Sequence, residues 1–141
     1  MSSHVQVLVP KLNVEIDEQI VDLVLAFNEI GVVQTISSCQ GNPGIIGEGG
    51  SYGHICFQDR TNPHSYIALA HVVFAIMWQP FRAEWDDFCA SVDAVERGYQ
   101  AWFRFRNERI GRALEIVNTD PNILHYRSVL TVRGKWERKR Q

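Results

Sequence analysis

Two apolar segments joined by a short polar turn place the strongest constraint on the fold of this chain. Residues 88–95 and 98–106 are connected through Glu96, Arg97 and Gly98, a spacing and composition that favour an antiparallel hairpin. In the second segment two sets of side chains alternate, Ala101, Phe103 and Phe105 against Gln100, Trp102, Arg104 and Arg106. Because successive strand residues point to opposite faces, this alternation predicts a sheet with one apolar face and one polar face.

Other segments supply the remaining strands and the helices that cover the sheet. Strands are predicted over 5–9, 32–37, 52–58 and 125–133. A first helix is expected to start at an Asp17 cap, to stop at Gly31 and to bury Ile20, Leu23, Val24, Phe27 and Ile30. A second is expected from Asn62 and Pro63 to about Gln79, and a third, capped by Asn107, should bury Ile110, Ala113, Leu114 and Val117.

Strands that follow one another directly, with about three helices among them, predict an α+β fold with a mostly antiparallel or mixed sheet. The 141 residues, 45% of them apolar and 21% charged, fit one globular domain. No repeat or linker divides the chain, so we expect a single domain over 1–133 and a basic C-terminal tail over 134–141.

The cysteines and the apolar runs indicate the compartment. Cys39, Cys56 and Cys89 are an odd number at wide spacing, which favours reduced thiols and a cytoplasmic protein. The N-terminus lacks the pattern of a signal peptide. The most apolar run, over 66–78, is shorter than the about 20 residues of a membrane span and contains His71, so we expect a core helix and no membrane anchor.

Charge is distributed unevenly along the chain. Residues 1–100 carry four basic and twelve acidic side chains, whereas residues 101–141 carry ten basic and four acidic ones. The polar side chains of the 98–106 segment include Trp102, Arg104 and Arg106, and Arg109 follows shortly after it. The indole offers an aromatic plane for a base, and the guanidinium groups offer donors for phosphate. The alternative is an ordinary solvated surface. The pattern predicts a small anionic or nucleotide ligand, with RNA as a candidate partner.

A second candidate site follows the strand predicted over 32–37. Consecutive small residues can turn backbone N–H groups toward one anion, and hydroxyls would add donors, so Ser37, Ser38, Cys39, Gln40 and Gly41 are candidate ligand-binding residues. The alternative is a tight turn in which Cys39 is a small buried hydrophobe. The glycine-rich loop up to Ser51 is expected to be flexible or shaped by a ligand.

Cys39 and His54 are the candidate catalytic pair. If their strands are neighbours, the imidazole could activate the thiol as a nucleophile, although the sequence indicates no third, orienting carboxylate. Residues that could also hold a metal are Cys39, His54, Cys56, His64 and His71, but only His54 and Cys56 are closely spaced, so no metal is expected.

The segment from Phe27 to Gly41 resembles a signature of the tRNA wybutosine-synthesizing protein 3 family. The shared pattern is a helix ending in glycine, a strand carrying Thr35, and then Ser37-Ser38-Cys39-x-Gly41, where Gln40 replaces the usual serine of the family. Beyond these fifteen or so residues the likeness is only in the order of elements. The resemblance implies an S-adenosylmethionine-dependent methyltransferase that acts on a modified guanosine of tRNA, with Ser37, Ser38, Cys39 and Gly41 near its site.

Three functional hypotheses follow from these patterns. The first is a protein that binds a nucleotide or modified nucleoside between the Ser38–Gly41 segment and the Trp102, Arg104 and Arg106 face, as a relative of such methyltransferases. The second is a non-catalytic module that sequesters a nucleotide or docks on a protein partner. The third is a homo-oligomer in which Trp102 and Trp136 anchor the interface.

Overall fold

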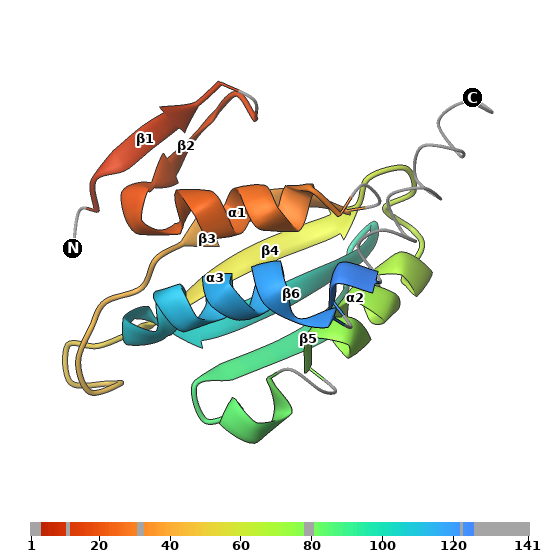
Figure 1. Cartoon of the computed structure of the whole chain (residues 1–141). Coiled ribbons are helices and arrows are strands. Elements are labelled where there is room, and N and C mark those ends of the chain that lie inside the picture. Colours follow the sequence, from red (N-terminus) through yellow and green to blue (C-terminus); the bar gives the residue numbers. More distant parts are fainter. Residues whose placement is uncertain (1–3, 11, 31–32, 78–80, 122, 126–141) are drawn as a thin grey trace.

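The computed structural model describes residues 4–10, 12–30, 33–77, 81–121 and 123–125. Its main element is a four-stranded antiparallel sheet with strand order β3-β4-β6-β5. The strands are β3 (Val33–Cys39), β4 (Tyr52–Asp59), β5 (Phe88–Val95) and β6 (Gly98–Arg106). A separate two-stranded antiparallel hairpin, β1 (Gln6–Val9) and β2 (Val14–Asp17), lies beside α1 (Figure 1).

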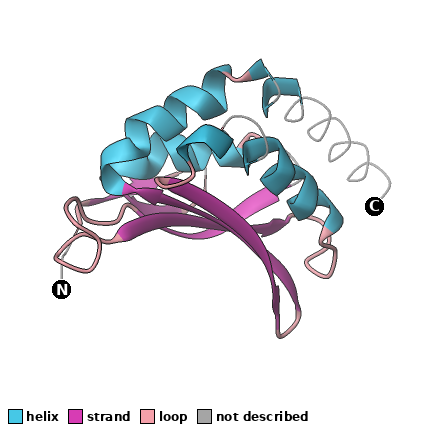
Figure 2. Cartoon of the chain, turned by 90° about the horizontal axis from the view of Figure 1, so that it is seen from below, coloured by secondary structure: helices cyan, strands magenta, loops and turns pink. Residues whose placement is uncertain are grey.

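The α-helices of the described chain, α1 (Val21–Asn28), α2 (Ile67–Met77) and α3 (Ile110–Thr119), lie on one face of this sheet (Figures 1 and 2). Within the described residues no helix lies across the opposite face, which we call the open face (Figure 2). This arrangement confirms the predicted α+β fold with a mostly antiparallel sheet. The helix-covered face carries the aromatic core, including Phe27, Phe57, Phe88, Phe103 and Phe105, each at most 1% exposed.

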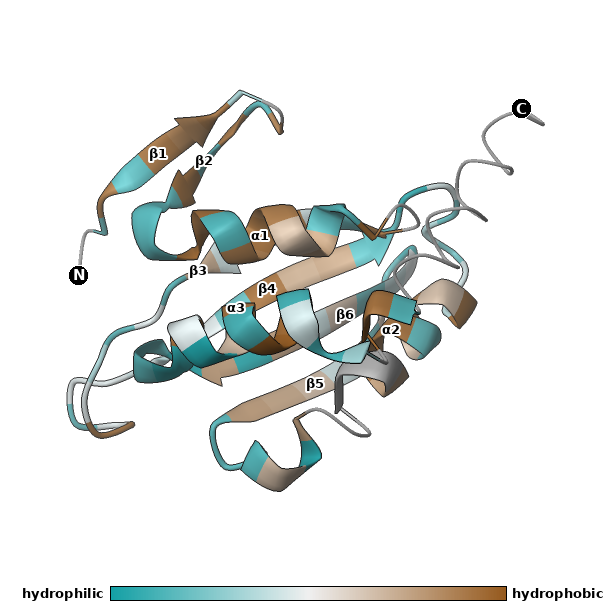
Figure 3. Cartoon of the chain, viewed as in Figure 1, coloured by the Kyte–Doolittle hydropathy of each residue, from teal (hydrophilic) through white to brown (hydrophobic). Residues whose placement is uncertain are grey.

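The periodic patterns were the reliable part of the sequence. The β5–β6 hairpin forms with the predicted alternation, since Ala101, Phe103 and Phe105 are buried and the residues between them are half-buried. The stripe predicted for the first helix is buried throughout, from Ile20 to Ile30. The third helix buries Ala113 and Val117, while Ile110 and Leu114 pack partly buried against the core. Figure 3 shows hydrophobic and hydrophilic residues alternating along α1, as expected for a helix with one face on the core.

Predictions of caps and boundaries were less accurate. Asp17 caps no helix, because its carboxylate accepts hydrogen bonds from His4, Gln6 and Gln40; it ends a strand, β2, that the sequence did not indicate. Asn107 likewise caps no helix, and its side chain donates to Gln19 and Gln40. The second helix begins at Ile67, since residues 62–65 form a turn in which the Asn62 side chain accepts from His64 N.

The structure changes the predicted end of β3, and it leaves other predicted boundaries outside the described residues. β3 continues through Ser38 and Cys39, which therefore belong to a strand and not to the following loop. That loop is itself paired, with Asn42 bridged to Ser51 and Ile46 to Gly50. Gly31, the predicted helix stop, lies outside the described residues. Of the strand predicted over 125–133, only His125 is described and it is helical; the rest of it and the tail 134–141 lie outside the described residues.

Candidate functional site

The register of the sheet brings the candidate residues into rows on the open face. Cys39 pairs with His54, His54 with Arg104, and Arg104 with Cys89. Next to this row, Ser37 pairs with Cys56, Cys56 with Trp102, and Trp102 with Ser91. Directly opposed residues share a face and hold their Cβ atoms about 4.5–5.5 Å apart. Residues that are far apart in the sequence therefore form one continuous polar surface.

Trp102 is at the centre of this surface. Its ring centroid lies 5.0 Å from that of His54, and the Arg104 guanidinium carbon lies 5.0 Å from the indole centroid. The second contact has the geometry of a cation–π interaction. Among the described residues no carboxylate lies within ion-pair distance of Arg104. Trp102 and Arg104 thus present an aromatic plane and an uncompensated cation at one place.

Burial changes the protonation chemistry of this face. Burial, together with the positive charge of Arg104, lowers the pKa of His54, so its imidazole is neutral near pH 7. Burial also raises the pKa of the Cys56 thiol to about 11. Cys56 is therefore a protonated thiol, and it lies opposite Trp102 with 1% of its surface exposed.

Cys39 and His54, the candidate catalytic pair, are neighbours in register at the end of β3. Their strands are therefore neighbours, as this pairing requires, and both residues are half-buried on the open face. No hydrogen bond joins the two side chains in the part of the chain that the structure describes. The charge of Asp17 acts on His54, but the hydrogen bonds of this carboxylate come from His4, Gln6 and Gln40, so it does not orient the His54 ring.

The backbone amides of the two residues after Cys39 donate hydrogen bonds within the protein. Gln40 N donates to Asp17 Oδ2 at 2.9 Å, and Gly41 N donates to the Cys39 sulfur at 3.5 Å. The amide groups predicted to bind an external anion therefore bind acceptors of the protein itself. Gly41 has a φ of +73°, and a Cβ there would lie 2.5 Å from Gly53 N, so only glycine fits. Ser38 pairs with Ile55 on the helix-covered side, away from the open face.

The predicted arginine stripe is divided between two sides of the molecule. Arg106 is opposite Tyr52 on the open face, where its guanidinium is 3.4 Å from the carbonyl oxygen of Gly44 and 3.7 Å from Glu108. Arg109 instead lies over the ring of core residue Phe88 and forms ion pairs with Glu84 and Asp87. The structure therefore does not bring Arg109 together with Trp102 and Arg104.

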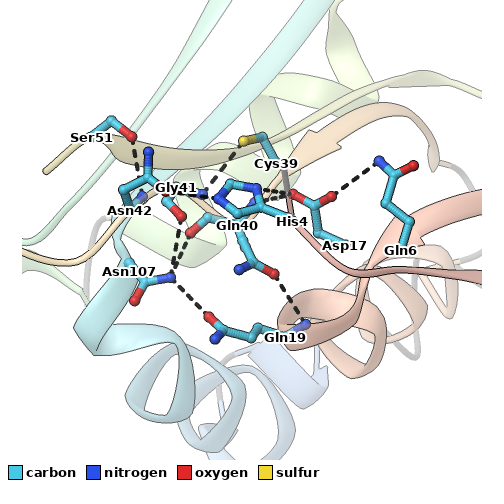
Figure 4. Close-up of polar contacts among 10 residues, drawn as sticks. All are labelled: His4, Gln6, Asp17, Gln19, Cys39, Gln40, Gly41, Asn42, Ser51 and Asn107. Atoms are coloured by element: carbon cyan, nitrogen blue, oxygen red, sulfur yellow. Dashed lines mark hydrogen bonds and ion pairs between the residues drawn. The ribbon is translucent and has the colours of Figure 1, made fainter. Parts of the chain in front are cut away.

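A further cluster, which sequence reasoning missed, joins the N-terminal segment to the ends of β2 and β3 (Figure 4). His4, Asp17 and Cys39 each place one donor atom within 4.8 Å of the others. His4 Nδ1 is 3.0 Å from Asp17 Oδ2, and His4 Nε2 is 2.8 Å from Asn42 Oδ1. These residues are widely separated in the sequence and share no motif spacing, so no local signal could have indicated the cluster.

Hydrogen bonds set the charges in this cluster. The bond to Asn42 is the main cause that raises the pKa of His4, with Asp17 adding to it against the effect of burial. Burial alone would raise the pKa of Asp17, but hydrogen bonds from Gln40, Gln6 and His4 outweigh it and lower that pKa. Both shifts favour an imidazolium paired with a carboxylate.

An apolar pocket lies at the β5 edge of the sheet. It has a volume of about 940 Å³ between α2 and β5, and Trp85, 72% exposed, contributes to its wall. None of the predicted ligand-binding residues lines it. Cys89, which lies opposite Arg104, is the residue of the polar rows that also lines the pocket.

No described helix has the length and apolar character needed to cross a membrane. Comparisons with known protein families, with curated proteins and with solved structures found no match to this chain.

Proposed function

We propose that this protein binds a nucleotide, or an exposed base of RNA, on the open face of its sheet. The observation that carries the proposal is the placement of Trp102 and Arg104 side by side on a face that no described helix covers, with no carboxylate at ion-pair distance from Arg104 among the described residues. A cation without a nearby anion is available to bind a phosphate. An adjacent aromatic plane would select a phosphate that carries a base.

Each side chain has a defined role in this proposal. The indole of Trp102 stacks on a base, an interaction that tolerates any base because each one has a π-face. Arg104 binds phosphate through its forked donors. The neutral His54 ring packs against the indole and limits its motion. Ser37, exposed and opposite Cys56, offers a hydroxyl for the sugar or the base edge.

Direct binding measurements test the proposal. The full chain is titrated separately with single-stranded RNA oligonucleotides, with mononucleotides and with S-adenosylmethionine. Comparing the three affinities distinguishes a polymeric ligand from a small one. Stacking contributes about 1–3 kcal/mol per base, so Trp102→Ala should weaken binding by about 5- to 150-fold. Arg104→Ala should also weaken binding, and should reduce the slope of log affinity against log salt by about one.

Arg112→Ala is the matched control, because its guanidinium is held by Glu84 and Glu115 on the helix side. It should leave the affinity unchanged. If Arg104→Ala and Trp102→Ala both bind as the unsubstituted protein does, the open face is not the nucleotide site.

Catalysis and simple retention of a ligand are separated by a second assay. The resemblance to the methyltransferase family makes S-adenosylmethionine and bulk tRNA the first substrates to supply. Transfer of a labelled methyl group that disappears in Cys39→Ser supports an enzyme. Ligand retention without transfer supports the alternative, a non-catalytic module.

A further inference from the structure

We propose that His4, Asp17 and Cys39 form a Zn²⁺ site. One donor atom from each residue lies within 4.8 Å of the other two, and the three side chains come from the N-terminal segment, β2 and β3. Imidazole nitrogen, carboxylate oxygen and thiolate sulfur are the three donors that proteins use for zinc. The proposal concerns a different ligand from the proposed function and does not depend on it.

The distances between the donor atoms suit tetrahedral coordination of the ion. Two donors bound at zinc–nitrogen and zinc–oxygen distances lie about 3.3 Å apart in a tetrahedral site. His4 Nδ1 and Asp17 Oδ2 are already 3.0 Å apart. The Cys39 sulfur is within 4.8 Å of one ring nitrogen of His4 and one carboxylate oxygen of Asp17, so side-chain movements of about 1 Å, given the longer zinc–sulfur bond, complete the set.

Surrounding hydrogen bonds orient these donors in the way that metal sites require. A ligating histidine usually gives its second ring N–H to an oxygen, which fixes the tautomer and the ring orientation. The Nε2 of His4 lies 2.8 Å from Asn42 Oδ1, which leaves Nδ1 directed at Asp17 (Figure 4). The other Asp17 oxygen accepts from Gln6 at 3.1 Å, and Gly41 N donates to the Cys39 sulfur.

The same contacts argue against Cys39 as a nucleophile activated by His4. A general base needs a free ring nitrogen within reach of the thiol. Both ring nitrogens of His4 have oxygen partners, Asp17 and Asn42. In the metal site the ion takes the place of the hydrogen shared between Nδ1 and Oδ2, and Nε2 keeps its bond to Asn42.

The charges of the site also match. A thiolate and a carboxylate with a neutral imidazole balance the two positive charges of Zn²⁺. Three protein ligands leave one tetrahedral position for water or another small ligand. Cys39 faces the open side of the sheet beside His54, so the site would adjoin the proposed nucleotide surface.

Cobalt substitution tests the site directly, since Co²⁺ bound by a thiolate shows a sulfur-to-metal charge-transfer band. The full chain, kept reduced with a phosphine, is titrated with Co²⁺ and then with Zn²⁺. We expect the band to saturate at one equivalent and to be abolished by one equivalent of Zn²⁺. Cys39→Ser should remove the band, and His4→Ala should weaken Zn²⁺ affinity by about tenfold or more.

Two matched controls separate the site from adventitious binding. Cys89→Ser removes an exposed thiol, and His64→Ala removes an exposed imidazole; both should keep the band and the affinity. Asn42→Ala should keep the band at saturation but weaken affinity by about 10- to 100-fold, as expected of a residue that positions a ligand.

Zn²⁺ should also raise the Tm of the unsubstituted protein and not that of Cys39→Ser, and circular dichroism checks that each variant is folded. Absence of a charge-transfer band in the unsubstituted protein, or its retention in Cys39→Ser, would overturn the proposal.

Discussion

The two faces of the same strand, β6, have opposite environments. Phe103 points to the helices and is fully buried in a cluster of aromatic rings, whereas its neighbours Trp102 and Arg104 point to the open face and are half-buried. On the helix side the rings are held by packing. On the open side the Trp102 ring contacts both the Arg104 guanidinium and the His54 ring. The first set stabilises the fold, and the second set is available to a ligand.

The arginines divide in the same way. Arg109 and Arg112, on the helix side, both bind the carboxylate of Glu84. Arg104, on the open side, contacts an indole and no described carboxylate. Arginine content therefore indicates little by itself, because a guanidinium that already holds a carboxylate is a poor phosphate site. Three experiments challenge this contrast between the faces.

The largest expected effect is on stability. Phe103→Ala should lower the free energy of unfolding by about 3–5 kcal/mol, because it leaves a cavity in the buried aromatic cluster. Trp102→Ala, one residue earlier, should cost about 1 kcal/mol, since only part of its ring is buried. Urea denaturation of both variants measures the difference. Equal losses would show that the open face is packed as the core is.

The second effect concerns thiols on the open face. With a pKa of about 11, Cys56 should have roughly a hundredfold less thiolate at pH 8 than a thiol of ordinary pKa, and its sulfur is covered as well. Alkylation followed by mass spectrometry should therefore label the exposed Cys89 much faster than the covered Cys56. Trp102→Ala uncovers Cys56 and should reduce the ratio of the Cys89 labelling rate to the Cys56 labelling rate by about tenfold.

Ser91→Ala is the control for this labelling experiment, because Ser91 lies in the same row on the other side of Trp102. It should leave the labelling ratio unchanged. Rapid labelling of Cys56 in the unsubstituted protein would show that Trp102 does not shield this part of the face.

The smallest effect is on acid stability. A hydrogen bond from Arg112, followed by the charges of Arg112 and Arg109, holds the pKa of Glu84 below its ordinary 4.5 against the effect of burial. A lowered pKa stabilises the folded state above the ordinary value, and that contribution is lost as pH falls through the folded value. Glu84→Gln should lower Tm by about 1–3 °C at pH 7, because exposed ion pairs contribute little.

The difference in Tm between Glu84→Gln and the unsubstituted protein should start to shrink as the pH falls below the ordinary pKa of a glutamate, and should vanish once the pH is below the lowered pKa of Glu84 in the folded protein. Glu48→Gln, an exposed carboxylate in the glycine-rich loop, controls for the loss of one negative charge. A Tm difference that persists unchanged into acid would mean that the Glu84 charge does not stabilise the fold.

Helices and strands with a strong hydrophobic period could be predicted from the sequence. The roles of polar side chains that bind a partner far away in the sequence could not. The alternation over 98–106 and the stripe of the first helix each report a local geometry, so both appear in the structure. Asp17 and Asn107 are residue types that often cap helices. Their side chains instead form hydrogen bonds with residues from distant segments, namely His4, Gln6, Gln19 and Gln40. A sequence shows that a side chain can cap a helix; it does not show which competing partner lies nearby.

The sequence by itself determined which residues lie on each face of the β5–β6 hairpin and of the helices, because side-chain direction repeats every 2 or 3.6 residues. It also placed Trp102 and Arg104 on one surface. Only the tertiary structure decided that Cys39 is opposite His54, that Arg109 pairs with Glu84, and that His4 and Asp17 meet Cys39. Those contacts depend on strand register and on how the N-terminal hairpin packs against the sheet. Such long-range geometry produces no periodic pattern in the sequence, so it could not be predicted from it.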